Sequence, residues 1–268
     1  MKLKLNKKFY EEKWFAVLIF LFGIMGLLVM CHHVYSYENI MRPFIDYLVE
    51  NQIITNDISG AAFLRMFTNE SNILVDMYLI YYALGIFGFK HLRSFTHNEW
   101  VRGAITLNIA VTGIIYFTVL LPFGGGTFPL EAINASGELQ STGPMWFSSC
   151  VNTWNHLITP VLFTAFWFFP ICQKKIPVVK YSLFYLIYPI CYFIMCVIYG
   201  AYDGFYPYPF LSGKQLFAML FKGQEYNPAI GTALLAAAVV LLCGVFFGVG
   251  CGLNAIHNAR VKEEKVEE

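Results

Sequence analysis

Six long apolar stretches constrain the fold of this chain more than any other feature. A membrane-spanning helix needs about 20 mostly apolar residues. Stretches of this kind lie at about 14–31, 72–89, 103–122, 150–171, 179–199 and 229–252. Of the 268 residues, 57% are hydrophobic and only 13% are charged, roughly half the charged fraction of a soluble domain. The sequence therefore predicts an all-α, multi-pass membrane protein.

Lysine and arginine divide unequally between the two faces that these spans would have. Of the 18 Lys and Arg residues, 14 lie in the two terminal tails, in the second and fourth connections, or, for Lys180, just after the fourth connection. Because positively charged loops stay in the cytoplasm, both termini are predicted to be cytoplasmic. No small-residue cleavage site follows the first span, so we interpret it as a retained span rather than a signal peptide. We expect one bundle of six helices, over residues 1–268, in the cell membrane.

Charge and cysteine content argue against several classes of partner. The net charge is +1, which gives no reason to expect a nucleic acid. The seven cysteines lie in apolar runs without CxxC or Cys/His spacing, so we expect no metal and no cofactor. Small apolar packing is one interpretation of these cysteines. A disulfide between Cys31 and Cys150, which fall near the same predicted face, is the alternative.

The predicted outer connections are longer than the cytoplasmic ones. Long connections on one face often carry function. The connection at 123–149 has no Lys or Arg and contains "FGGGTFPLEAINASG". It suits either a flap over a site or a plain polar loop.

A first polar cluster lies where the chain enters the second span from the outer side. Thr68, Asn72 and Asp76 fall within an arc of about 80° on one helix face. An ionisable residue such as Asp76 is costly inside a membrane, so it should face the bundle interior and have a partner. Thr68 suits an N-cap, and a hydroxyl there would also lie beside unpaired N–H groups.

A second cluster lies in the fourth span, which also enters from outside. Asn152, His156 and Thr159 share one helix face at spacings of four and three. Pro160 removes the hydrogen bond that the carbonyl of His156 would accept in a regular helix. A buried imidazole at this depth favours the neutral form, which can act as a base. A hydrogen-bonded packing histidine is the alternative.

A third cluster is formed by tyrosines of the fifth span and of the "YPYPFL" turn after it. The two prolines of this turn cannot lie inside a helix, so the turn should form a stiff wall of the outer mouth. Tyrosines also suit the wet edge of a bilayer. The residues that we expect around a substrate are Asn72, Asn152, Asn155, Thr159, Tyr188, Tyr192, Tyr206 and Tyr208.

The sixth span carries a structural pattern instead. Gly244, Gly248 and Gly252 form two overlapping GxxxG steps on one face. Such steps permit close contact between helices.

Four stretches of the chain carry a family resemblance. They are "FTNESNILV", "VRGAITLNIAVTGIIY", "NHLITPVLF" and "IYPICYFIMCVIYGAYDGFYPYPFL". They resemble bacterial six-helix membrane proteins of the Pr-six-Pr type, which are similar in turn to the eukaryotic androgen-induced-gene (FAR-17a) family. Members of that family are intramembrane threonine hydrolases that cleave fatty-acid esters of hydroxy fatty acids. The resemblance implies Thr68 as nucleophile and His156 as base.

This chemistry is consistent with the residue types, because a threonine hydroxyl is a weak nucleophile and needs an adjacent base. Asp76 would orient the base in a triad-like arrangement. The sequence thus predicts a lipid-ester hydrolase that takes a membrane lipid or acyl ester at the outer leaflet. Acyl transfer by the same residues is one alternative. The other alternative is a non-enzymatic membrane protein. Such a protein would be structural, bind a partner, or line a pathway for a small solute.

Overall fold

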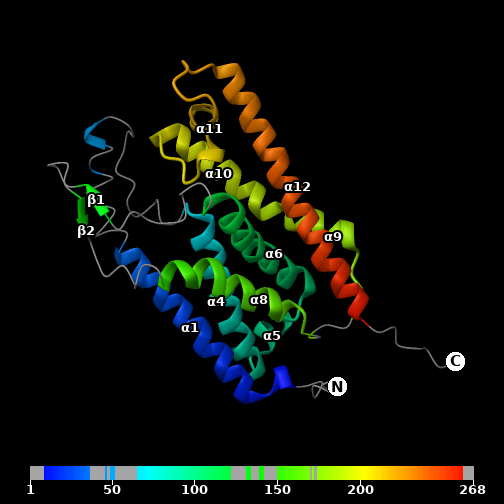
Figure 1. Ribbon diagram of the computed structural model, residues 1–268. Helices are drawn as coiled ribbons and strands as arrows, with labels where there is room; N and C mark the ends of the chain where they lie inside the picture. The colour runs from blue at the N-terminus through cyan, green and yellow to red at the C-terminus, as the bar shows by residue number, and fades with distance from the viewer. Residues whose placement is uncertain are drawn as a thin grey trace.

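The computed structural model describes residues 9–36, 46, 49–51, 65–121, 131–133, 139–141, 150–169, 171 and 174–261. These residues are mainly helical, which confirms the predicted all-α class (Figure 1). The helical segments are η1 (Phe9–Glu11), α1 (Lys13–Ser36), α4 (Phe67–Ile86), α5 (Lys90–Thr96), α6 (Glu99–Ile115), η3 (Tyr116–Leu120), η4 (Trp154–Ile158), α8 (Thr159–Trp167), α9 (Val178–Tyr185), α10 (Ile187–Asp203), η5 (Pro209–Leu211), α11 (Gly213–Leu220) and α12 (Pro228–Arg260).

The connection at 123–149 contributes the only two strands in the described part of the chain. β1 (Glu131–Ile133) and β2 (Leu139–Ser141) pair antiparallel, with Ala132 opposite Gln140. The rest of the predicted flap lies outside the described residues.

Four helices of the described chain are long and apolar enough to cross a membrane, which indicates a membrane protein. They run over Lys13–His32, Glu99–Leu120, Val178–Asp203 and Pro228–Arg260. The second and fourth predicted spans also form helices, namely α4 and a helix that runs from residue 150 to 167. α4 is polar in its first turns, and the helix over 150–167 is divided by a π-helical segment.

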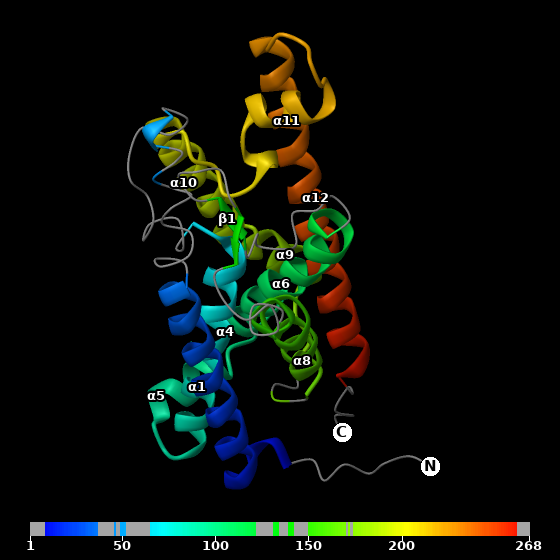
Figure 2. The ribbon, with the colours of Figure 1, turned by 60° about the vertical axis from the view of Figure 1, so that its left-hand side comes forward.

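α4 lies at the centre of the molecule, between α1 on one side and α6 and α8 on the other (Figures 1 and 2). Its buried Val75, Leu79 and Tyr82 pack with Phe163 and Phe166 of α8. A second core joins α6, α9 and α12, and a third joins α10 to the turn at 206–211. The polar first turns of α4 are thus surrounded by protein rather than placed at its surface.

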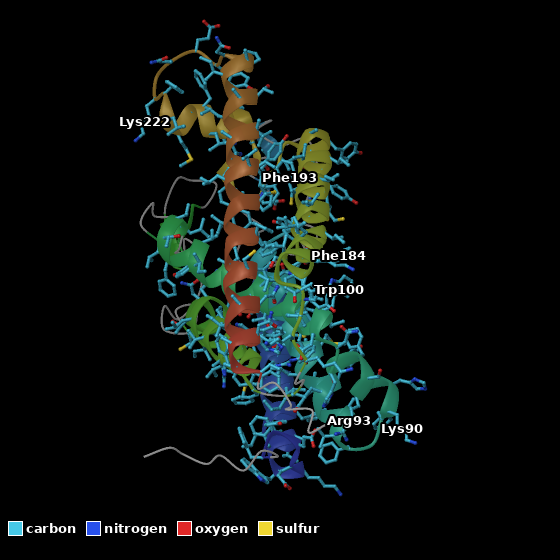
Figure 3. All side chains as sticks on the ribbon, turned by 90° about the vertical axis from the view of Figure 1, so that its right-hand side faces the viewer. Lys90, Arg93, Trp100, Phe184, Phe193 and Lys222 are labelled. Atoms are coloured by element: carbon cyan, nitrogen blue, oxygen red, sulfur yellow. The ribbon has the colours of Figure 1, made fainter. Side chains whose placement is uncertain are left out.

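Basic residues lie at opposite ends of the molecule (Figure 3). Lys90 and Arg93 project at the end where α1 begins and α12 finishes, and Lys222 projects at the other end. Basic side chains thus project at both ends of the molecule.

The predicted fifth span is interrupted before its proline. α9 ends at Tyr185 and α10 begins at Ile187, so the break lies about one turn before Pro189, which has no N–H to donate to the carbonyl of Tyr185. α10 then ends at Gly204, whose φ of 80° is the left-handed conformation that glycine adopts without strain. The chain leaves the helix before the YPYPFL turn, as expected.

Neither the GxxxG steps nor the cysteine pair makes, within the described residues, the contact that the sequence would permit. A methyl group added to Gly244, Gly248 or Gly252 would meet nothing within 4 Å, so no described residue lies directly against these three glycines. Cys31 and Cys150 are both free thiols, so they do not form a disulfide.

Candidate active site

The first residues of α4 and the π-helical segment η4 bring two predicted site residues into contact. The hydroxyl oxygen of Thr68 lies 3.2 Å from Nε2 of His156. Both residues are at least nine-tenths buried. Thr68 is the second residue of α4, and Met66 occupies the N-cap position without a side-chain cap. The N-cap interpretation of Thr68 is therefore wrong, because α4 begins about one turn earlier than its apolar run.

Pro160 explains why the helix widens at His156. In a regular α-helix the carbonyl of His156 would accept a hydrogen bond from residue 160, and proline has no N–H to give. The chain is π-helical from Trp154 to Ile158, and the N–H of Thr159 donates to the carbonyl of Trp154. Gly113 of α6 lies directly against Pro160 and the His156 carbonyl, where an added methyl group would be 3.0 Å from the Pro160 ring. Such π segments occur frequently at functional sites.

The surroundings of His156 fix which ring nitrogen carries the proton. Nδ1 lies 3.1 Å from the backbone carbonyl of Asn152, which is an acceptor only. Nδ1 therefore donates, and Nε2 of the neutral ring has its lone pair directed at the Thr68 hydroxyl. The ring also stacks on Tyr116 of η3, with centroids 4.0 Å apart. The Tyr116 hydroxyl in turn accepts from the side-chain amide of Asn152 at 2.5 Å.

Hydrogen bonds also hold the backbone of Thr68 in place. Its carbonyl accepts from the Ser71 hydroxyl at 3.0 Å and from the Asn72 amide at 2.8 Å. The Asn72 amide donates in addition to the carbonyl of Asn155 at 3.1 Å, which ties α4 to η4. The Ser71 hydroxyl lies 2.9 Å from that of Thr112 on α6. Three helices thus fix the position of the nucleophile candidate.

Asp76 does not belong to this constellation. It is buried in the bundle interior, as predicted, but its carboxylate faces Gly26 of α1. Neither of its oxygens has a hydrogen-bond partner among the residues that the structure describes. The group that accepts from Nδ1 of His156 is the Asn152 carbonyl rather than Asp76, because Asp76 lies on the part of the α4 surface that α1 covers.

An apolar pocket opens beside Thr68, and His156 is not one of its lining residues. It lies between α4, α6, α10, α12 and the turn at 208–211, and its cavity volume is about 110 Å³. Phe193 of α10 projects into the space between α10 and α12 (Figure 3). Thr68 is one of the few polar groups on its wall.

Only two of the eight predicted substrate residues, Tyr192 and Tyr208, line this pocket. The other six do not line it. The side chains of Asn72 and Asn152 join helices through the bonds given above, Asn155 contributes only its backbone carbonyl to these bonds, and Thr159 is fully buried in α8. Tyr188 donates a short hydrogen bond to Glu70. The ring of Tyr206 lies against Gly200.

The YPYPFL turn places Tyr208 in contact with Thr68, the nucleophile candidate. The phenol oxygen of Tyr208 lies 3.4 Å from the Thr68 nitrogen and 3.5 Å from the Thr68 hydroxyl oxygen. Burial raises the pKa of Tyr208 above its ordinary value, so the phenol stays neutral.

A buried ion pair joins the segment before Thr68 to the segment before Tyr208. Arg65, three residues before Thr68, lies 2.5 Å from Asp203 at the end of α10, and both side chains are buried. The Tyr192 hydroxyl donates to the carbonyl of Arg65 at 2.5 Å. The start of α4 and the turn after α10 are therefore held together.

Sequence reasoning missed several of these contacts. The pairs Arg65–Asp203 and Glu70–Tyr188 each join residues more than 100 positions apart. The charged members of both pairs lie beside apolar runs, which is a signal for a buried partner. No group of three His, Cys, Asp or Glu side chains able to hold a metal lies within the described residues.

Comparison with known protein families, curated proteins and solved structures found no match for this chain. The resemblance to the FAR-17a family therefore stays a prediction.

Proposed function

We propose that this chain is a six-span membrane hydrolase of lipid esters, with Thr68 as nucleophile and His156 as base. The observation that carries the proposal is the 3.2 Å contact between the Thr68 hydroxyl and Nε2 of a histidine whose Nδ1 donates elsewhere. This is the geometry and the tautomer that a base needs to accept the hydroxyl proton.

The proposed reaction has two steps. The Thr68 oxygen attacks the ester carbonyl carbon while its proton passes to Nε2 of His156. The tetrahedral intermediate then collapses, and His156 returns the proton to the departing alcohol, leaving an acyl group on Thr68. Water, deprotonated by His156, attacks this second ester and releases a fatty acid and free Thr68.

The pocket supports a lipid as the substrate. Its walls are mostly Val, Leu, Ile and Phe side chains from α6, α10 and α12, which suit an acyl chain rather than a polar solute. Ile190 lines the pocket and is itself 41% exposed, so the pocket lies next to the outer surface of α10. A lipid would enter sideways from the bilayer between α10 and α12.

The charge pattern supports the proposed topology. With α4 and the helix over 150–167 as spans two and four, 14 of the 18 Lys and Arg residues fall on the side of the two termini. Thr68 and the pocket then lie in the outer half of a cell membrane. A cysteine introduced at Tyr226 should react with an impermeant thiol reagent in intact cells, and one at Lys174 should not. The reverse labelling would contradict this topology.

A lipophilic fluorophosphonate tests the chemistry, because it traps an activated hydroxyl covalently. The purified protein in detergent should be labelled. Thr68→Ala should abolish labelling, Thr68→Ser should retain part of it, and His156→Ala should slow it by about 100-fold or more, the scale for a positioned base.

Thr232→Ala is the matched control, since Thr232 is an exposed threonine on α12 that bonds only its own helix. It should be labelled at the rate of the unaltered protein. Each variant must elute as folded protein in size-exclusion chromatography. Unaltered protein that takes no label and hydrolyses no lipid ester would overturn the proposal and favour a non-enzymatic role.

A further inference from the structure

Tyr208 and His156 both contact the Thr68 hydroxyl, and of the two only Tyr208 lines the apolar pocket. Nε2 of His156 is 3.2 Å from the hydroxyl oxygen of Thr68. Tyr208 lines the apolar pocket, and its phenol oxygen is 3.5 Å from the same hydroxyl oxygen. The phenol is thus on the pocket wall beside Thr68, on the side from which the proposed ester substrate would reach the hydroxyl, whereas His156 does not line the pocket.

The direction of the hydrogen bonds leaves the phenol proton available. The N–H of Thr68 belongs to the first turn of α4 and has no helical acceptor. It donates to the phenol oxygen of Tyr208 at 3.4 Å. A phenol that accepts one hydrogen bond still has its own proton to donate, and the nearest group in this direction is the reacting hydroxyl of Thr68.

We infer that Tyr208 is a further catalytic residue, which donates a hydrogen bond to the oxyanion formed when Thr68 attacks the ester. This inference rests on the proposed function. In the attack the bond between Thr68 Oγ1 and the carbonyl carbon forms, the carbonyl π electrons move to oxygen, and the Thr68 proton moves to His156. Tyr208 keeps its proton throughout, so it stabilises charge without taking part in proton transfer.

The turn that carries Tyr208 holds the phenol in position before the reaction. Pro207 and Pro209 restrict the backbone on both sides. The Tyr208 ring stacks on Phe210, with centroids 5.1 Å apart and planes at 4°. Arg65 and Asp203 fix the two ends of the arrangement by their buried ion pair. A donor that needs no rearrangement is what makes an oxyanion site effective.

The charge state of Tyr208 agrees with this role. Burial holds its pKa above the ordinary value, so the phenol remains a donor across the physiological range. The Thr68 N–H, directed at the phenol oxygen, increases the acidity of the phenol proton and therefore its strength as a donor.

Tyr208→Phe tests the inference, because it removes one oxygen and keeps the ring that stacks on Phe210. Hydrolysis of a p-nitrophenyl ester of a long-chain fatty acid is measured in detergent micelles. The loss of one oxyanion donor should lower kcat by about 100-fold or more. Because the bond is made only in the transition state, kcat and kcat/KM should fall by the same factor.

Tyr206→Phe is the matched control. Tyr206 lies in the same turn but does not line the pocket, and no bond joins it to Thr68 among the described contacts. It should retain the activity of the unaltered protein. Both variants should melt within a few degrees of that protein, which separates a chemical effect from misfolding.

The outcomes separate this inference from the proposed function. If Thr68→Ala and His156→Ala are inactive while Tyr208→Phe keeps full kcat, the role of Tyr208 is wrong and the hydrolase proposal stands. A Tyr208→Phe variant that raises KM at unchanged kcat would also overturn it, since that result assigns ground-state binding. Unaltered protein without esterase activity overturns both.

Discussion

The carboxylate of Asp76 lies against the α-carbon of Gly26, where α4 crosses α1. A methyl group at Gly26 would lie well inside van der Waals distance of both carboxylate oxygens. Gly26→Ala should therefore destabilise the protein by about 1–3 kcal/mol, the range for overpacking. Asp76→Ala in the same chain should relieve most of this loss, because it removes the group that the methyl meets.

Thermal unfolding in detergent measures both variants. Gly244→Ala is the control, because a methyl group there meets nothing within 4 Å. It should be neutral, or more stable by up to about 1 kcal/mol because alanine favours a helix more than glycine. Equal effects of Gly26→Ala with and without Asp76 would contradict the contact.

Pro160 gives a prediction about the geometry of the base. Pro160→Ala restores an N–H that can bond the His156 carbonyl, which favours an α-helix over the π-helical segment. Stability should stay equal or rise. Activity should fall by about 100-fold, since a shift of about 1 Å at a reacting group has effects of this size.

Fluorophosphonate labelling of Pro160→Ala gives the measurement. Pro228→Ala is the control. Pro228 occupies the first turn of α12, so an N–H introduced there would have no acceptor within the helix. Pro160→Ala protein that is labelled at the unaltered rate would show that the π-helical segment does not position His156.

The sequence predicts the helices and the contact between Thr68 and His156. It does not predict the contacts that hold this site in place, such as the ion pair of Arg65 with Asp203. Apolar runs locate the long helices, and Pro160 and Pro189 locate the two irregularities in them. The start of α4 is misplaced because its first turns are polar although they are buried. Hydropathy alone cannot distinguish a polar turn inside a protein from one in a loop.

The roles within the site depend on helix rotation, which the sequence does not give. Asp76 and Asn72 share a helix face within 40°, yet Asn72 bonds η4 while Asp76 faces α1. Likewise, Tyr206 and Tyr208 are two residues apart, and only Tyr208 reaches Thr68. Such differences follow from tertiary packing between residues 50 or more positions apart in the sequence.

Removing one partner of the buried pair Arg65–Asp203 should destabilise the protein more than replacing both partners. Arg65→Met leaves the Asp203 carboxylate buried without its cation, which typically costs about 3–5 kcal/mol. The double variant Arg65→Met/Asp203→Asn should recover at least half of this, because the amide oxygen of Asn can still accept from the N–H of Phe205. Chemical denaturation measures the three proteins. A double variant that is less stable than Arg65→Met would contradict this account.

His97 gives a pH dependence of stability. Burial lowers its pKa, with smaller effects from Arg93 and Glu11. The unfolded chain takes up a proton below about pH 6.5, while the folded chain resists it. His97 therefore leaves stability unaffected above about pH 6.5 and lowers it progressively as the pH falls toward its folded pKa. His97→Gln should reduce the acid-side slope of the melting temperature, and an unchanged slope would contradict the prediction.

Cys243 offers a test of the pocket as the acyl-chain site, because it lies on the pocket wall contributed by α12. Cys243→Phe adds volume to that wall and should exclude long chains while Thr68 and His156 stay in contact. The ratio of kcat/KM for a hexadecanoyl ester to that for a butanoyl ester should fall by at least about tenfold, as expected when a pocket loses room for several methylenes. Cys251→Phe is the control, since Cys251 lies on the same helix but outside the pocket. If Cys243→Phe lowers kcat/KM equally for the hexadecanoyl and the butanoyl ester, the substitution has disturbed the site instead. If it changes kcat/KM for neither ester, the acyl chain binds elsewhere.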